Sequence, residues 1–528
     1  MSNQKDRKHK QLNSFYLTNF QTKKPMKKMT LKKLFGGICC AAMAMLAVSC
    51  AQGVDDETWT SGVSGVQLES PAADAIAFSL ATDASGNEKV KVQWPVSMGA
   101  GGYEITVINV NDPENPEVVV DHETVDGCSY LFPLAEDTNY EVSVLTLGNE
   151  KYNNAGAAAA TTVAYSSMIG GQTIPAGTEI GEYITNWMVE HESEYMAAIA
   201  ADPNFEWAFD LERGAAYTLD APAKSGLVPI RLRGTQGVRP VVTVGEKGCL
   251  MPAAGLKIKN VNFDCEAMTG TLGLIEMDKT RTDVPVNSNK VMQCPYPIRI
   301  ESCWVRELAK SLFNIGYGAW GVKEFRMSDC MVQLNCKNDD QWQTFINAWQ
   351  NKGVVNGAEG VSWYGAILNT YVLNSTVWNR YESATLKDKN YFIRFANQSI
   401  DKAVGSYNGV FDIKNSTLVR MVPRKDFGNN IANKSQYVIT FENTNFWDCY
   451  RLQKVKRGGT YVWKNNTIWG VFNSVDSTDK KEIATEENMG FTDENIFKAM
   501  DLTQPNGGVN FTATGTISST IGDPRWLN

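Results

Sequence analysis

Two short runs, Leu256-Lys-Ile-Lys-Asn260 and Ile298-Arg-Ile-Glu-Ser302, share a pattern that indicates the fold of most of this chain. Both read apolar, polar, apolar, polar, and both end on a small polar residue. The pattern recurs toward the C-terminus, at 325–329, 393–397, 411–415, 439–443 and 461–465. Alternation with a period of two predicts short strands with one buried face.

Such strands cannot bury their inner faces alone, so the recurrence predicts coils stacked around a continuous apolar core. Asn tolerates the left-handed backbone that a sharp corner requires. We therefore expect Asn side chains of successive coils to bond to one another, and Asn374 fits the same column. This is the logic of a right-handed parallel β-helix. A sandwich array or a propeller is the alternative, but the irregular spacing argues against a propeller.

The start and the end of this region carry a family resemblance. The stretches 209–219 and 228–234 resemble the opening coils of pectate-lyase-like proteins, and Ile521-Gly-Asp-Pro-Arg-Trp526 looks like the closing motif of Bacteroidetes outer-surface β-helix proteins. Apolar residues at helical spacing over Tyr183–Ala200 predict a helix that caps the open end of the solenoid. Residues 166–528 are thus predicted to form a pectate-lyase-like parallel β-helix.

Residues 64–165 show a different all-β pattern. The alternating runs Lys89–Trp94, Tyr103–Ile108 and Tyr140–Leu145, separated by turn residues, predict an antiparallel sandwich. The run Leu134–Tyr140 resembles the tyrosine corner of a fibronectin type III domain, with Trp94 and Tyr103 at core positions. That resemblance implies a spacer or a binding module.

The N-terminus reads as an export signal. Basic residues precede the apolar run Leu34–Ser49, and Cys50 follows its small residues directly. Residues 1–49 are predicted to be a signal peptide, with translation starting at Met26 or Met29. The arrangement resembles a bacterial lipoprotein signal, which implies that Cys50 is lipidated.

The predicted linker, residues 50–63, contains Asp55-Asp56-Glu57, similar to the surface-export signal of Bacteroidetes lipoproteins. The resemblance implies a lipid anchor in the outer membrane, with the chain facing the cell exterior.

Charge and cysteine spacing exclude several classes of function. The first 49 residues hold ten of the 50 Lys and Arg and one of the 58 Asp and Glu, so the remainder has a net charge near −17. Such a chain is not built to bind nucleic acid. Its cysteines lack the close pairs of a zinc site. In an oxidising compartment, Cys303 and Cys330 are the first disulfide candidates.

The repeats also suggest a ligand-binding face. The first polar position of the aligned strands holds a cation in four copies, at Lys257, Arg299, Arg326 and Arg394. Neighbouring strands lie about 4.8 Å apart, so these side chains are expected to form a basic ladder that binds carboxylates. Ion pairs with nearby acids on a solvated sheet face are the alternative.

Aromatic residues add a second candidate. Sugar rings stack on exposed aromatic faces, and the loop candidates for this role are Trp342, Trp349, Trp363 and Tyr364. Core packing is the alternative for each. The polar loop residues Asn338, Asp339 and Asp340 are candidates for calcium, and no other cofactor is expected. None of the three histidines lies among the repeats and there is no Gly-His-Gly segment, which argues against a polygalacturonase-like hydrolase.

These features lead to a surface lipoprotein that binds extracellular polysaccharide, with or without uronate sugars, and passes it to a neighbouring transporter without catalysis. The first alternative is a polysaccharide lyase, with Arg299, Arg326 or Arg394 as the base. The second alternative is a structural or adhesion lipoprotein.

Overall fold

The computed structural model describes residues 64–83, 87–336, 344–381, 391–396, 400–421, 427–431, 436–449, 452, 459–469, 491–492, 497–499, 509–513 and 520–527. Strands are the main regular structure among them, and helices are few. The chain divides into two compact units. The first contains 1–106, 120–133 and 143–163, and the second contains 107–119, 134–142 and 164–528. The predicted signal peptide, Cys50 and the acidic linker lie outside the described residues, and the predicted domain bounds stay a prediction.

Two small sheets occupy the N-terminal part of the described chain. One has the order β1-β2-β5 and is antiparallel. The other has the order β4-β3-β6-β7. Trp94, Tyr103 and Tyr140 are all buried, as the alternation predicted. The strands are β1 (Ala77–Thr82), β2 (Glu88–Gln93), β3 (Tyr103–Asn109), β4 (Glu117–Val125), β5 (Ser129–Pro133), β6 (Asn139–Thr146) and β7 (Thr161–Ser166).

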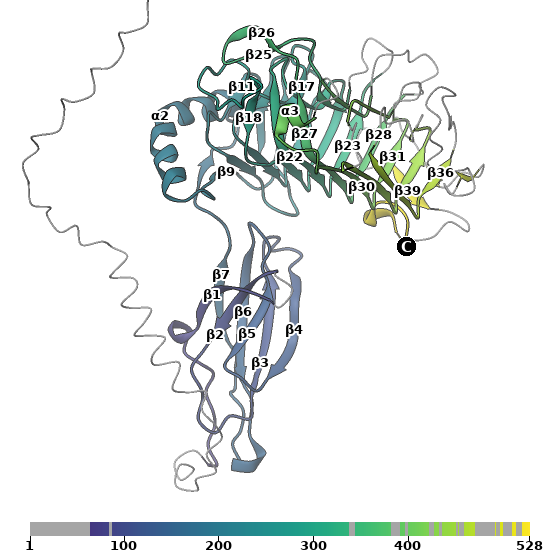
Figure 1. The fold of residues 1–528 in the computed structure, drawn as a ribbon. Coiled ribbons are helices and arrows are strands. Elements are labelled where there is room, and N and C mark those ends of the chain that lie inside the picture. The colour runs from purple at the N-terminus through teal and green to yellow at the C-terminus, as the bar shows by residue number, and fades with distance from the viewer. Residues whose placement is uncertain are drawn as a thin grey trace, which may run out of the picture. The chain divides into compact units, whose positions relative to one another are not determined.

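The rest of the second unit is a solenoid of three long sheets, visible as the stacked arrows of Figure 1. Strands pair in parallel with those one coil away. The eleven-stranded sheet contains β8 (Gly171–Ile174), β9 (Trp207–Leu211), β12 (Ile230–Arg233), β15 (Leu256–Lys259), β18 (Met292–Cys294), β19 (Ile298–Glu301), β22 (Trp320–Ser328), β27 (Ala366–Leu373), β30 (Val410–Lys414), β33 (Val438–Glu442) and β35 (Thr460–Lys464).

The other two long sheets complete each coil. The ten-stranded sheet contains β10 (Ala216–Leu219), β13 (Val241–Val244), β16 (Asn262–Asp264), β20 (Trp304–Leu308), β23 (Met331–Leu334), β28 (Thr376–Asn379), β31 (Thr417–Val419), β34 (Asn445–Trp447), β36 (Thr467–Trp469) and β37 (Phe491–Thr492). The seven-stranded sheet contains β11 (Pro222–Lys224), β14 (Cys249–Met251), β17 (Gly273–Glu276), β21 (Ser311–Asn314), β24 (Ile346–Ala348), β29 (Ile393–Phe395) and β32 (Gly428–Asn429).

The predicted register holds along most of the eleven-stranded sheet. Leu256 lies opposite Ile298, which lies opposite Phe325. These inward residues belong to one apolar core that runs through the solenoid. Burying such a face is the main favourable term for a strand that is too short to be stable alone.

The corner after this sheet is a column of small polar residues with left-handed backbone. The column comprises Asn260, Ser302, Asp329, Asn374, Asn415, Asn443 and Asn465, all with φ between 48° and 57°. From Asn374 onward, each amide nitrogen donates to the side-chain oxygen of the preceding member, at 2.6–3.2 Å. The predicted asparagine ladder is therefore confirmed.

The predicted helix is also confirmed. Helix α2 (Ile180–Ala201) lies beside the first coil at the N-terminal end of the solenoid (Figure 1). Its buried face contains Ile184, Met188 and Tyr195, which join the solenoid core. Glu179 caps the helix, since its carboxylate accepts hydrogen bonds from the amides of Gly181 and Glu182.

The C-terminal motif packs against the later coils. Asp523 is fully buried and accepts a hydrogen bond of 2.6 Å from Thr376 Oγ1. Arg525 donates to the backbone oxygens of Asp329, Cys330 and Asn374. The motif thus joins two neighbouring corners of the solenoid.

The remaining described elements lie outside the three long sheets. They are α3 (Ile400–Val404), the hairpin β25 (Gly353–Val355) and β26 (Ala358–Ser362), the pair β38 (Phe497–Ala499) and β39 (Asn510–Ala513), and the 3-10 turns η2 (Ala73–Ala75), η3 (Glu150–Tyr152) and η5 (Pro524–Trp526). Cys303 and Cys330, the first disulfide candidates, are both buried thiols that are not joined to each other.

Candidate functional site

Three of the four predicted cations lie side by side. Lys257 on β15, Arg299 on β19 and Arg326 on β22 are direct register partners in adjacent strands. Arg231 on β12 extends the series by one strand. Arg231 lies in the run Ile230-Arg-Leu-Arg233, which shows the same apolar-Arg-apolar alternation as the repeated strands. This run was not among the repeats from which the four cations were predicted. We call Arg231, Lys257, Arg299 and Arg326 the basic column.

Carboxylates of the same chain neutralise the basic column. Arg299 and Arg326 both contact Glu324 Oε1, at 3.0 and 3.2 Å. The guanidinium of Arg326 also lies 4.5 Å from the centre of the Tyr371 ring. Lys257 pairs with Glu206 at 2.9 Å. These contacts match the alternative interpretation, an ion-paired sheet face.

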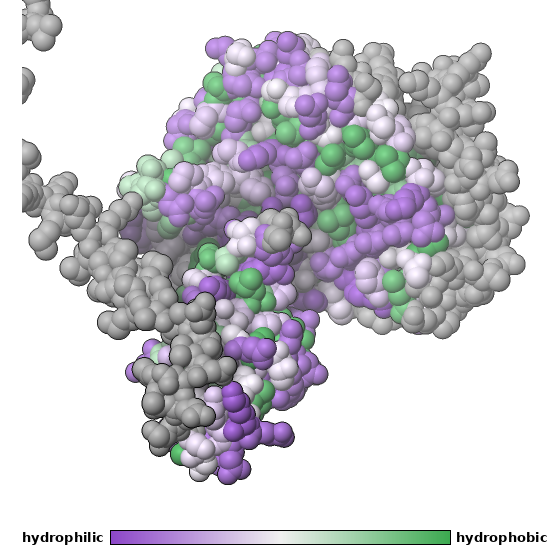
Figure 2. All heavy atoms as spheres, turned by 60° about the horizontal axis from the view of Figure 1, so that its bottom comes forward, coloured by the Kyte–Doolittle hydropathy of each residue, from purple (hydrophilic) through white to green (hydrophobic). Residues whose placement is uncertain are grey.

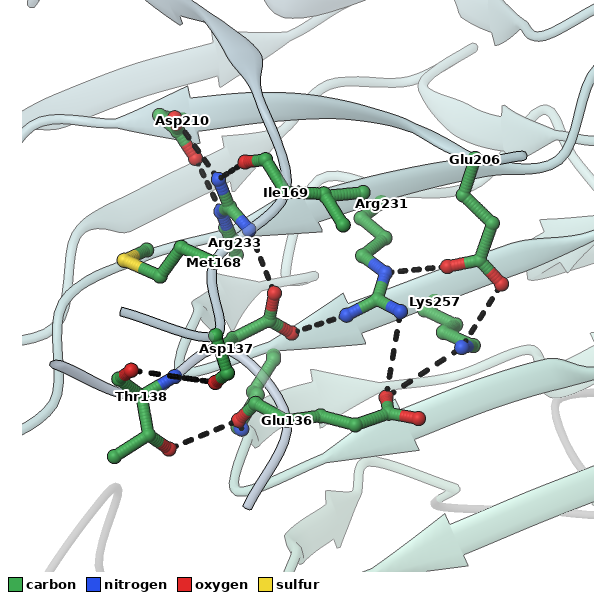
Figure 3. Close-up of polar contacts among 12 residues, drawn as sticks. Glu136, Asp137, Thr138, Met168, Ile169, Glu206, Asp210, Arg231, Arg233 and Lys257 are labelled. Carbon is green, nitrogen blue, oxygen red and sulfur yellow. Dashed lines mark hydrogen bonds and ion pairs between the residues drawn. The ribbon is translucent and has the colours of Figure 1, made fainter. Parts of the chain in front are cut away.

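The most buried part of this network surrounds Asp137, in the segment 134–142 of the second unit (Figure 3). Its two carboxylate oxygens accept hydrogen bonds from Arg231 at 2.7 Å and from Arg233 at 2.6 Å. Burial alone would raise the pKa of Asp137, but the two arginines reverse that effect and lower it below its usual value. Glu136 adds ion pairs to Arg231 and Lys257, both at 3.5 Å.

The prediction for the position of Arg394 was wrong. Arg394 lies on β29 in the seven-stranded sheet, opposite Asn347 and Asn429, and not in the basic column. The expected ladder of four aligned cations therefore has a different fourth member. The run at 393–397 reads apolar-Arg-apolar-Ala-Asn, which resembles the strands of the eleven-stranded sheet. The sequence pattern therefore did not show that this run belongs to the seven-stranded sheet.

Arg394 instead forms an aromatic-lined site with a predicted tryptophan. Its guanidinium lies 4.0 Å from the centre of the Trp349 ring and 5.1 Å from that of Tyr391. Its Nε is buried and has no hydrogen-bond partner among the described residues, which also place no carboxylate within ion-pair distance. Burial lowers the pKa of Arg394. A guanidinium on an aromatic face, without a carboxylate partner among the described residues, is suited to binding a carboxylate beside a stacked ring.

The other aromatic candidates differ in exposure. Trp363 is 52% exposed, and Lys352 Nζ lies 5.9 Å from its ring centre. Tyr364 packs against the solenoid core. Trp342 and the calcium candidates Asn338, Asp339 and Asp340 lie outside the described residues. Within the described ranges there is no cluster of three or more His, Cys, Asp or Glu that fits a metal ion.

The seven-stranded sheet presents a second polar column that the sequence analysis missed. Glu276, Asn314, Asn347, Arg394 and Asn429 are successive register partners on β17, β21, β24, β29 and β32. At the Glu276 end of this column lies a groove of about 330 Å³, lined in part by Lys247, Glu276, Lys279 and Tyr317. The signal for Tyr317 was its place between two glycines, three residues after the end of a strand.

The comparisons with known proteins identify no function. A family model described as a domain of unknown function, DUF4992, matches residues 24–214. This is less than half of the chain, and it ends before β10. No curated protein and no solved structure matches the chain. In the described part of the chain, no helix has the length and apolar character needed to span a membrane.

Proposed function

We propose that this chain is a lipid-anchored surface protein that binds extracellular, acidic polysaccharide through its solenoid. Arg394, stacked on Trp349 without a carboxylate partner among the described residues, is the observation that carries the proposal. Neutral sugar rings need an aromatic face, and uronate sugars also need a cation. The Arg394 site offers both, whereas the basic column is occupied by carboxylates of the chain itself.

The character of the exposed surface supports a polar ligand. The face of the solenoid drawn in Figure 2 is mainly hydrophilic, and its hydrophobic residues form small separate groups. A large apolar patch would instead favour a protein partner or a lipid surface. Lys352 and Trp363 form a second pair of cation and aromatic ring, like Arg394 and Trp349, and Trp363 is more exposed.

The cellular setting is part of the same proposal. A signal peptide is cut before Cys50, and acylation of that residue anchors the protein in the outer membrane. A fibronectin type III-like sandwich acts as a spacer. A right-handed, pectate-lyase-like β-helix delivers glycan to a neighbouring transporter. The hydroxyl of Tyr140 accepts a hydrogen bond of 2.9 Å from the amide of Ala135, which supports the tyrosine corner. Loss of fatty-acid labelling in Cys50→Ala tests the anchor.

The binding test compares two arginine variants in affinity gels and by calorimetry. We expect wild-type protein to be retarded by polygalacturonate and alginate. Loss of a charge-assisted contact of about 1.5–3 kcal/mol predicts that Arg394→Ala weakens binding about tenfold or more. Arg306→Ala removes a guanidinium that is already paired with Asp264 and is the matched control. No retardation of wild-type protein by any polysaccharide would favour a structural or adhesion role.

A lyase remains the second candidate, because one observation favours it. A lyase base must lie beside the carbon next to a uronate carboxylate, and Arg394 lies against Trp349 with no carboxylate partner among the described residues. Arg299 and Arg326 are less suited, since both already form ion pairs with the carboxylate of Glu324. Ultraviolet absorbance from an unsaturated product, present in wild type and lost in Arg394→Lys, would establish catalysis.

A further inference from the structure

The groove beside β17 displays an aromatic ring in a conformation that the sequence alone disfavours. Tyr317 is 49% exposed and has φ of 62°, a backbone region that bulky residues rarely adopt. Gly316 before it also has φ of 62°, and a Cβ there would lie 2.7 Å from the Met277 carbonyl oxygen. Packing therefore constrains the backbone of this turn, and the turn places the Tyr317 ring in the lining of the groove. Unfavourable backbone geometry of this kind is concentrated at functional sites.

Two lysines line the groove. Lys279 Nζ lies 5.3 Å from the centre of the Tyr317 ring, and Lys247 lines the same groove. Neither lysine forms an ion pair with a carboxylate of the described residues. A local excess of positive charge in an acidic chain favours an anionic ligand at this place.

A buried carboxyl group also lines the groove. Glu276 is 8% exposed, its Oε2 accepts a hydrogen bond of 3.0 Å from the Leu272 amide, and its Oε1 has no partner among the described residues. Burial raises its pKa, Asp278 adds to that effect, and Lys279 and the Leu272 amide oppose it only in part. A carboxyl group in this setting is a hydrogen-bond partner for a hydroxyl of the ligand.

The groove and the Arg394 site lie on one line. Glu276 and Arg394 belong to the same polar column and are three strand steps apart, with Asn314 and Asn347 between them. At about 4.8 Å a step, the separation is about 14 Å along the solenoid. Both ends of this line pair a cation with an aromatic ring, Lys279 with Tyr317 and Arg394 with Trp349.

We infer that the groove is a second subsite for the same uronate polysaccharide, in which a sugar ring stacks on Tyr317, its carboxylate binds Lys247 and Lys279, and a hydroxyl bonds to Glu276. The inference rests on the proposed function of the Arg394 site. One extended polymer chain then follows the polar column and occupies both subsites. Because the second contact becomes intramolecular once the first has formed, affinity increases with ligand length until both are filled.

The test measures the affinity of size-fractionated oligogalacturonides, from dimers upward, by calorimetry. In wild type we expect a stepwise increase with length. Tyr317→Ala and the double variant Lys247→Ala/Lys279→Ala are expected to weaken binding of the long oligomers about tenfold. Both variants should leave the affinity for galacturonide dimers, which bind at the Arg394 site, unchanged. Tyr317→Phe keeps the ring and should restore the length dependence, and Lys323→Ala removes an exposed lysine elsewhere as the control.

The outcomes separate the two proposals. If Arg394→Ala weakens binding while the Tyr317 and lysine variants bind long oligomers as wild type does, the second subsite is wrong and the proposed function stands. If wild type binds no oligogalacturonide of any length and is retarded by no polysaccharide in the affinity gels, both are wrong. Unchanged thermal unfolding of each variant shows that lost affinity does not reflect lost folding.

Discussion

Single charged residues decide which parts of the solenoid face are available to a ligand. Arg299 and Arg394 look alike in the sequence, since each follows and precedes an apolar residue. Glu324 lies 3.0 Å from Arg299, whereas Arg394 lies against Trp349. A paired guanidinium must lose its partner before it binds an anion, and an unpaired one need not.

Asp137 gives the sharpest prediction at this scale. Replacing it with Asn leaves Arg231 and Arg233 without their shared carboxylate, and breaking a buried ion pair costs about 3 kcal/mol or more. We expect Asp137→Asn to lower the free energy of unfolding by that amount at pH 7, as measured by urea denaturation. The exposed Glu141→Gln is the matched control, and an equal loss in both variants would contradict the assignment.

The pH dependence follows from the sign of the shift. Folding lowers the pKa of Asp137, so the unfolded chain binds the proton more tightly. The stabilisation that ionised Asp137 gives the folded protein is complete above about 3.9, the pKa of Asp in the unfolded chain. It is lost as the pH falls through the lower pKa of Asp137 in the folded protein. Wild type and Asp137→Asn should therefore differ most at neutral pH and converge in acid. A constant difference down to the lowest accessible pH would show that packing, not charge, explains the loss.

At the scale of elements, the corners hold adjacent coils in register. Asn415 has φ of 48°, donates to Asn374 at 3.2 Å and accepts from Asn443 at 3.2 Å. Alanine lacks both hydrogen bonds and disfavours this backbone, so we expect Asn415→Ala to cost about 2–3 kcal/mol of unfolding free energy. Asn415→Gly keeps the backbone freedom and should cost about 1 kcal/mol less.

The comparison of these two variants tests the reason for the ladder. Equal losses in Ala and Gly would mean that backbone conformation contributes nothing and the hydrogen bonds everything. The exposed Asn408→Ala is the control for loss of an asparagine outside the ladder, and we expect it to unfold as wild type does.

The elements show how far local pattern predicts the fold. Helix α2, most strands of the eleven-stranded sheet and the asparagine corners follow from period, apolar spacing and backbone preference, which are local properties. The run at 393–397 has the same local pattern but forms β29 of another sheet. Strand formation is local, whereas assignment to a sheet depends on how many residues the intervening loops take up.

At the scale of the whole molecule, the C-terminal motif fastens the later coils. Asp523 is fully buried and accepts hydrogen bonds from Thr376 Oγ1 at 2.6 Å and from Arg525 Nε at 3.1 Å. Removing a buried acceptor leaves its donors unsatisfied, at a cost of about 1–3 kcal/mol. We expect Asp523→Ala to destabilise the C-terminal coils and to speed their cleavage in limited proteolysis. Glu359→Ala, an exposed carboxylate, should leave the cleavage pattern unchanged.

The sequence by itself determined the all-β class, the capping helix, the polar corners and three members of the basic column, because each depends on residues close together in the chain. Which of these cations are neutralised depends on contacts between distant parts of the chain. Asp137 and Arg231 are 94 residues apart, and Tyr317 shares its groove with Lys247. The physical reason is that ion pairing and burial depend on distance in space. An alternating strand specifies which side chains face outward, but the fold determines which of them meet a partner.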